Sequence, residues 1–285
     1  MEIPNELFKY REFEKYTILS LLSKGLWIPK PEQLNDPFDA QFKISDADVS
    51  IEEFKSAFLS FKKWYLENNS QNISYEGFEM LFEDGKPNTH LKEKVNLFRE
   101  FWDSESKTMG ILSLSEDPKS TTMWSHYGQN HTGICIGYDP VLLAPESPNG
   151  VVDWLRQVEY VAEKDIVRNS YLLFAKTGMG HSHRSTMELF FKMLTTKSTD
   201  WAYEKEWRFL LPNNGGKVFK LEIEAISSIT FGLRTSVETK TAVAHLLRYH
   251  QKKTKFYQSI RCENTIGLER IGLDSKSNYW LESYE

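Results

Sequence analysis

Apolar residues recur every three or four positions in several segments of the chain, which is the spacing of one face of an α-helix. The longest such pattern begins at Ser50, which forms a capping box with Glu53. We therefore predict a helical insertion or subdomain over residues 50–105, with its aromatic stripe packed in a core. Shorter helices are expected over residues 16–22 closed by Gly25 as a C-cap, in the stretch ending near Ala175, after a cap formed by Ser185 and Glu188, and from Ser236.

Short apolar runs bounded by turn residues predict the strands of a sheet. These runs do not alternate regularly with the helices, as they would in a doubly wound fold. The predicted fold class is therefore α+β, with a mixed or antiparallel sheet core, in a single domain over residues 1–285. The predicted strands are residues 111–114, 133–138, 158–161, 207–211, 218–223, 229–231, 256–260 and 266–273.

Charge and cysteine content exclude several classes of protein. With 35 Lys and Arg against 40 Asp and Glu, the net charge is −5, which argues against coating nucleic acid through bulk charge. Cys135 and Cys262 form neither a disulfide framework nor a zinc site of the usual spacing, so we expect no metal. The first residues lack the features of a signal peptide, and no apolar stretch approaches about 20 residues. We therefore expect a cytoplasmic protein without a membrane partner.

The first of three polar boxes combines a Lys-Tyr-Arg run ending in Tyr10 and Arg11 with the loop that holds Asn35, Asp36 and Asp39. A strand that ends in this run can place a cation and a phenol at the edge of a cleft. Arg suits bidentate recognition of a phosphate or a ribose diol. Arg11 could equally pair with Asp36 or Asp39 and pin the loop, and both interpretations stay open.

The second box is the run Trp124, Ser125, His126 and Tyr127. Such a run would make a poor core segment, because each polar group needs its own hydrogen-bond partner. Aromatic rings beside a hydroxyl and an imidazole suit stacking on a flat ligand while hydrogen-bonding its edge. A structural role for the histidine is the alternative.

The third box runs from Tyr203 to Arg208 and enters a predicted strand. Alternation along a strand would put Glu204, Glu206 and Arg208 on one face. Two carboxylates beside an arginine suit either charge stabilisation in catalysis or a structural ion pair. Glu206 is the first candidate for a catalytic acid and Glu204 the second.

Four motifs in these boxes resemble a bacterial family known only as domain of unknown function 2971. They are the Lys-Tyr-Arg start, the Asn-Asp-Pro-Phe-Asp loop, the Trp-Ser-His-Tyr run and the Tyr-Glu-x-Glu-Trp-Arg end at residues 203–208. The resemblance extends over nearly the whole chain, but the family implies no activity.

The order of the motifs is also similar to that of ADP-ribosyltransferase-like folds. This second resemblance implies split sheets and NAD as the cofactor. It implies that Arg11 contacts NAD, that Tyr127 stacks on the nicotinamide and that Glu206 is the catalytic acid. It also implies an acceptor that is a protein, a nucleic acid or water, and an effector role as a toxin or in phage defence. The remaining residues expected at this nucleotide site are Tyr10, Trp124, Ser125, His126 and Arg208.

Two other functions fit the same residues. A metal-dependent nuclease or phosphoesterase would use carboxylates of the first and third boxes with His126 or His131, because hard oxygen ligands suit Mg²⁺. A sensor or partner-binding subunit without catalytic activity would use the same aromatic cleft to bind a nucleotide or a peptide. The macromolecular partner would be another protein or a second copy of the chain.

Overall fold

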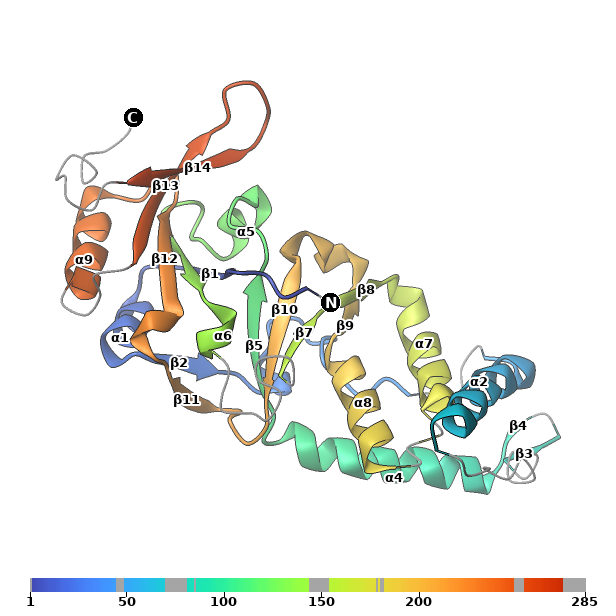
Figure 1. Cartoon of the computed structure of the whole chain (residues 1–285). Coiled ribbons are helices and arrows are strands. Elements are labelled where there is room, and N and C mark those ends of the chain that lie inside the picture. The colour runs from blue at the N-terminus through green and yellow to red at the C-terminus, as the bar shows by residue number, and fades with distance from the viewer. Residues whose placement is uncertain are drawn as a thin grey trace. The chain divides into compact units, whose positions relative to one another are not determined.

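The computed structural model describes residues 2–44, 49–69, 81–84, 86–143, 154–177, 179, 182–248 and 254–273. The chain divides into two compact units (Figure 1). Unit 1 comprises Met1–Pro29, Gly110–Val158 and Asp200–Glu285, and unit 2 comprises Lys30–Met109 and Glu159–Thr199. The predicted helical segment 50–105 therefore shares its unit with a later part of the chain.

Unit 1 is built on an eight-stranded sheet with the order β14-β13-β12-β6-β1-β5-β10-β7 (Figure 1). Neighbouring strands are antiparallel, except that β12 and β13 are parallel. The mixed sheet and the α+β class predicted from the sequence are confirmed. The strands are β1 (Leu7–Arg11), β5 (Gly110–Ser115), β6 (Ile134–Tyr138), β7 (Leu155–Gln157), β10 (Glu206–Leu211), β12 (Ile226–Phe231), β13 (Lys255–Arg261) and β14 (Leu268–Leu273).

Both faces of this sheet are covered, as the complete burial of β6 indicates. On one face, Ile136 and Phe209 belong to a core with Leu21 and Val243. These two residues come from α1 (Lys15–Ser23) and α9 (Val237–Arg248). On the other face, Trp124 of α5 packs in a smaller apolar cluster. Smaller elements of the unit are β2 (Gly25–Ile28) paired with β11 (Lys217–Lys220), α6 (Pro140–Leu143), η3 (Thr199–Glu204) and η4 (Ile223–Ala225), and α5 spans Thr121–His126.

The sheet is less tightly paired between β1 and β5 than elsewhere. β1 pairs with β6 from Leu7 to Arg11, and β5 pairs with β10 from Gly110 to Ser115. Between β1 and β5, the register of these fully described strands contains the single pair Phe8 and Ser115. Backbone groups beyond this pair must therefore find other partners.

Unit 2 is mainly helical and has an aromatic core. The rings of Phe54 and Tyr171 lie 4.8 Å apart, and those of Trp102 and Phe190 lie 5.0 Å apart. The prediction that the aromatic stripe of residues 50–105 packs in a core is confirmed for its described side chains. Its elements are η1 (Pro31–Gln33), α2 (Ile51–Asn69), β3 (Phe82–Glu83), β4 (Lys86–Pro87), α4 (Thr89–Ser106), β8 (Glu159–Val161), α7 (Glu163–Lys176), α8 (His183–Leu194) and β9 (Thr196–Ser198). No helix in the described residues of either unit is long and apolar enough to cross a membrane.

Two predicted helix caps are wrong by one or a few residues. Helix α1 ends at Lys24, which adopts the left-handed conformation with φ 54°, and not at Gly25. Gly25 starts β2, where a Cβ would lie 2.5 Å from Cγ1 of Val218 in β11, so the glycine relieves crowding between the two strands. Helix α8 is capped by Ser182, whose side chain accepts from the backbone N–H of Ser185.

A prediction concerns Gly133, which lies where two backbone segments meet. A Cβ there would lie 2.2 Å from the carbonyl oxygen of Arg11 and 3.0 Å from that of Gly128. We expect Gly133→Ala to lower the free energy of unfolding by about 2 kcal/mol, measured by urea denaturation, because the backbone must shift. The control is Gly272→Ala, whose new Cβ would have its nearest neighbour 4.0 Å away, and its effect should stay within about 0.5 kcal/mol. Equal small effects of both variants would contradict the close approach.

Candidate functional site

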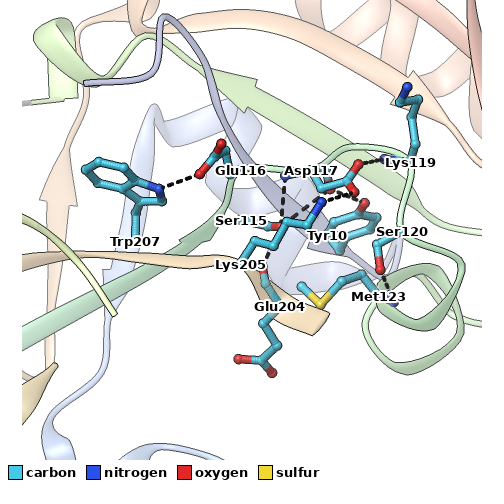
Figure 2. Close-up of polar contacts among 10 residues, drawn as sticks. All are labelled: Tyr10, Ser115, Glu116, Asp117, Lys119, Ser120, Met123, Glu204, Lys205 and Trp207. Carbon is cyan, nitrogen blue, oxygen red and sulfur yellow. Dashed lines mark hydrogen bonds and ion pairs between the residues drawn. The ribbon is translucent and has the colours of Figure 1, made fainter. Parts of the chain in front are cut away.

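The turn that follows β5 connects three parts of unit 1 (Figure 2). The Ser115 hydroxyl donates to the carbonyl oxygen of Glu204 over 2.7 Å. The Tyr10 hydroxyl donates to the carbonyl oxygen of Asp117 over 2.5 Å, and the Lys205 ammonium lies 3.1 Å from the Asp117 carboxylate. These contacts fix β1, β5 and the backbone before β10 relative to one another.

A local change of backbone direction separates Glu204 from Glu206. Glu204 is the last residue of η3, Lys205 has a φ of 44°, and β10 starts at Glu206. A residue other than glycine in the left-handed region is uncommon, and such strained positions cluster at functional sites. The alternation that puts Glu206 and Arg208 on one face therefore does not extend to Glu204. The prediction that all three share a strand face is wrong in this respect.

Glu204 is joined to the second box by a hydrogen bond. The Tyr127 hydroxyl donates to Glu204 Oε1 over 2.7 Å, and Glu204 is only 5% exposed. Figure 2 shows the Glu204 carboxylate directed away from the Ser115 turn that holds its backbone. Because a buried carboxylate is costly unless it is hydrogen-bonded, this contact fixes both side chains.

Three partly accessible rings lie at this contact. They belong to Tyr127 itself, His126 and Tyr203, and we call these three residues the ring cluster. His126 Nδ1 lies 3.0 Å from the Tyr203 hydroxyl. The His126 ring packs edge to face against Tyr203 and Tyr127, with centroids 5.6 and 6.2 Å away. His126 is exposed and both tyrosines are half-buried, so the cluster can contact a ligand. Tyr203 was not among the site residues predicted from the sequence.

Glu206 forms a buried ion pair with Arg208. Arg208 Nε lies 2.8 Å from Oε1 and Arg208 Nη2 lies 3.0 Å from Oε2. Glu206 is 3% exposed and Arg208 is fully buried. This bidentate geometry is the structural ion pair that the sequence left open as an alternative to catalysis.

Lys9 lies where β1 and β5 diverge, and sequence reasoning did not include it among the site residues. Its ammonium donates to the carbonyl oxygen of Ser113 over 2.8 Å. Burial lowers the pKa of Lys9 to about 7, Arg11 acts in the same direction, and Glu206 and Glu204 oppose it. An amine with a pKa near neutrality can exchange a proton under physiological conditions. The one signal in the sequence was a second cation, two residues before Arg11, within the short first strand.

The Arg11 side chain lies on the face of the sheet opposite to the face that carries Glu206. Residues directly across an antiparallel pair share a face, which places Phe8, Ser115 and Glu206 together. Arg11 is three residues beyond Phe8 and so points to the other face. There it lines a cavity of about 600 Å³ with residues of α1 and β2, and none of the ring cluster lines that cavity. The structure therefore does not bring Arg11 to Tyr127 and Glu206.

Three other residues of unit 1 were predicted to contact the nucleotide, namely Tyr10, Trp124 and Ser125. Trp124 is fully buried, its indole N–H donates to the Pro118 carbonyl oxygen, and its ring packs edge to face on Tyr10, which is also buried. Ser125 is exposed, and its hydroxyl donates to the Thr121 carbonyl oxygen within α5. The position of Trp124 does not support stacking on a ligand.

The loop of the first box lies in unit 2. Asp36, the residue after Asn35, accepts a hydrogen bond on its carboxylate from the backbone N–H of Phe38. This contact forms a local turn. Asp39 is buried, and its carboxylate lies 3.6 Å from the Lys197 ammonium. In the part of the chain that the structure describes, no three His, Cys, Asp or Glu side chains group closely enough to hold a metal ion.

Comparison with known families gives one match. A family model described as "Protein of unknown function (DUF2971)" matches residues 123–209. This confirms the resemblance over the stretch that contains the second and third boxes, while the first box lies outside the matched residues. No curated protein and no solved structure matches the chain. The match therefore covers Tyr127 and Glu204 but assigns them no activity.

The pKa of Lys9 predicts a pH dependence of stability. In the unfolded chain the amine keeps its proton up to its ordinary pKa of 10.5, whereas in the folded protein it loses it near 7. Between these values unfolding takes up a proton, so the free energy of unfolding rises with pH. We expect the free energy of unfolding of the wild type, relative to that of Lys9→Met, to rise between about pH 7 and 10. Urea denaturation at a series of pH values measures this difference. The exposed Lys119→Met is the control, and a Lys9→Met difference that stays flat or falls would contradict the assignment.

The Arg208–Glu206 pair predicts a second effect on stability. Arg208→Met leaves the buried Glu206 carboxylate without this partner, which should cost about 3–5 kcal/mol of unfolding free energy. Lys205→Met removes a lysine that is largely exposed and should cost less than about 1 kcal/mol. Thermal and urea denaturation of the two variants would measure the difference, and an equal cost would show that the buried pair is not structural.

Proposed function

We propose that this chain is an ADP-ribosyltransferase-like enzyme that binds NAD at the ring cluster and cleaves its nicotinamide–ribose bond. The observation that carries the proposal is the hydrogen bond from Tyr127 to Glu204. It places a buried, oriented carboxylate directly beside partly accessible rings. Such a combination suits a ligand with a flat ring attached to a sugar.

The ring cluster supplies the surface that a nicotinamide or adenine ring needs. The faces of Tyr127 and Tyr203 offer apolar contact, while the His126 imidazole offers polar atoms at its edge. The His126–Tyr203 contact limits the rotation of both side chains. Rings that are held in place lose little conformational freedom when a ligand stacks on them.

Glu204 would stabilise the charge that develops during bond cleavage. Loss of a leaving group from a ribose builds up positive charge on the sugar, as in glycosidases. A preoriented carboxylate in a largely dry site stabilises that charge strongly. We assign this role to Glu204 and not to Glu206, because Arg208 engages both oxygens of Glu206.

Lys9 is not assigned a catalytic role. Its pKa of about 7 lets the neutral amine form at physiological pH, but alternation along β1 puts its side chain on the face of Arg11, opposite to Glu206. The acceptor in this proposal is a protein, a nucleic acid or water.

Nucleotide binding without chemistry is the second candidate. The low exposure of Glu204 and Glu206 favours it, because a buried carboxylate reaches a substrate only when the substrate enters beside it. In that case the ring cluster would bind the nucleotide and Glu204 would only orient Tyr127.

The test is release of nicotinamide from labelled NAD, with and without added protein or nucleic acid acceptors. We expect turnover by the wild type and a loss of at least about a hundredfold in Glu204→Gln, because removing one stabilising group of this kind costs about 10² to 10³ in rate. The matched control is Glu222→Gln, an exposed acid of the same unit, which should stay within about twofold.

Two outcomes would contradict the assignment. A loss confined to a folded Glu206→Gln variant would transfer the catalytic role to Glu206. Absence of nicotinamide release by the wild type would remove the enzyme proposal, and saturable binding of NAD in the same sample would leave the binding role.

A further inference from the structure

The cavity that Arg11 lines lies within unit 1, on the face of the sheet opposite to Glu206. It has a volume of about 600 Å³, which is within the range of small-molecule sites. It lies between α1, the β2–β11 pair, and strands β1 and β6. The residues that matter for its chemistry are Arg11, Leu19, Leu26, Trp27, Tyr138 and Val218.

Apolar side chains remain accessible around the mouth of this cavity. Tyr16 and Leu19 of α1 are 71% and 47% exposed. Trp27 and Val218, which face each other across β2 and β11, are 48% and 60% exposed. These side chains offer apolar contact to a ligand at the mouth of the cavity.

Arg11 supplies the one positive charge among the lining residues. Its side chain is half-buried, and within the described residues its guanidinium makes no hydrogen bond or ion pair. A guanidinium that no other described side chain engages is available to an anionic ligand.

The other polar groups of the cavity are less available or lie close to Arg11. The hydroxyls of Thr17 and Ser20 already donate to backbone carbonyl oxygens. The Tyr138 hydroxyl has no hydrogen-bond partner among the described residues. Burial raises the pKa of Tyr138 and the positive charge of Arg11 opposes this, which indicates that the two groups are near each other.

We propose that this cavity binds a small organic monocarboxylate, with the carboxylate on Arg11 and the apolar body against Leu26 and Trp27. The planar guanidinium matches a carboxylate in a bidentate geometry, and the Tyr138 hydroxyl adds a donor. The acidic side chain of Glu14, which also lines the cavity, disfavours ligands with a second negative charge. This site is independent of the proposed NAD site, because the two lie on opposite faces of the sheet.

Calorimetric titration of the whole chain with octanoate and with phenylacetate tests this proposal. We expect saturable binding of at least one of them, weakened at least about tenfold in Arg11→Gln. The uncharged octanamide and phenylacetamide should bind at least about tenfold more weakly than the acids. Arg261→Gln, which changes an exposed arginine of β13, and Glu204→Gln should both bind as the wild type does.

A second variant keeps the test valid if Arg11→Gln fails to fold. Leu19→Glu places a negative charge at the mouth of the cavity on a half-exposed helix position, and it should weaken carboxylate binding in a folded protein. The proposal is overturned if neither acid binds the wild type, if the amides bind as tightly as the acids, or if the folded variants bind unchanged. Because Glu204→Gln is a control here, failure of this site and failure of the NAD proposal are distinguishable.

Discussion

The arrangement of the candidate site depends on the hydrogen bond between the Tyr127 hydroxyl and the buried Glu204 carboxylate. A carboxylate in a low-dielectric environment must accept hydrogen bonds, or folding would neutralise it or expel it. This requirement brings α5 to a segment that lies 77 residues further along the chain. The Ser115 hydroxyl meets the same requirement for the backbone, because it donates to the Glu204 carbonyl oxygen. Together these contacts position the ring cluster and the acid as one group.

Part of this arrangement follows from the sequence. Strand periodicity places Glu206 and Arg208 on one face, and the buried ion pair is the direct consequence. The polar groups in the run that ends in Tyr127 need hydrogen-bond partners, and the carboxylates of the third box can supply them. The mixed sheet follows from short strands that do not alternate with helices. These features are local or depend on simple periodicity, so a single sequence is sufficient for them.

The remaining features depend on contacts that a single sequence does not contain. Alternation shows that Lys9 and Arg11 share a face of β1, but it does not show which face meets the third box. The lowered pKa of Lys9 results from burial where β1 and β5 diverge, which is a property of the sheet. The left-handed conformation of Lys205 has no signature in its residue type, yet it separates Glu204 from the face of Glu206. The sequence therefore placed Arg11 and Glu206 in one site, whereas in the structure they lie on opposite faces of the sheet.

A double-mutant cycle measures the central contact most directly. The free energy of unfolding would be determined for wild type, Tyr127→Phe, Glu204→Gln and the double variant, and the coupling energy would be taken from the four values. A hydrogen bond to a buried charged group predicts a coupling of about 1.5–3 kcal/mol. A coupling below about 0.3 kcal/mol, with all four proteins folded, would show that the two residues act independently and would contradict the account.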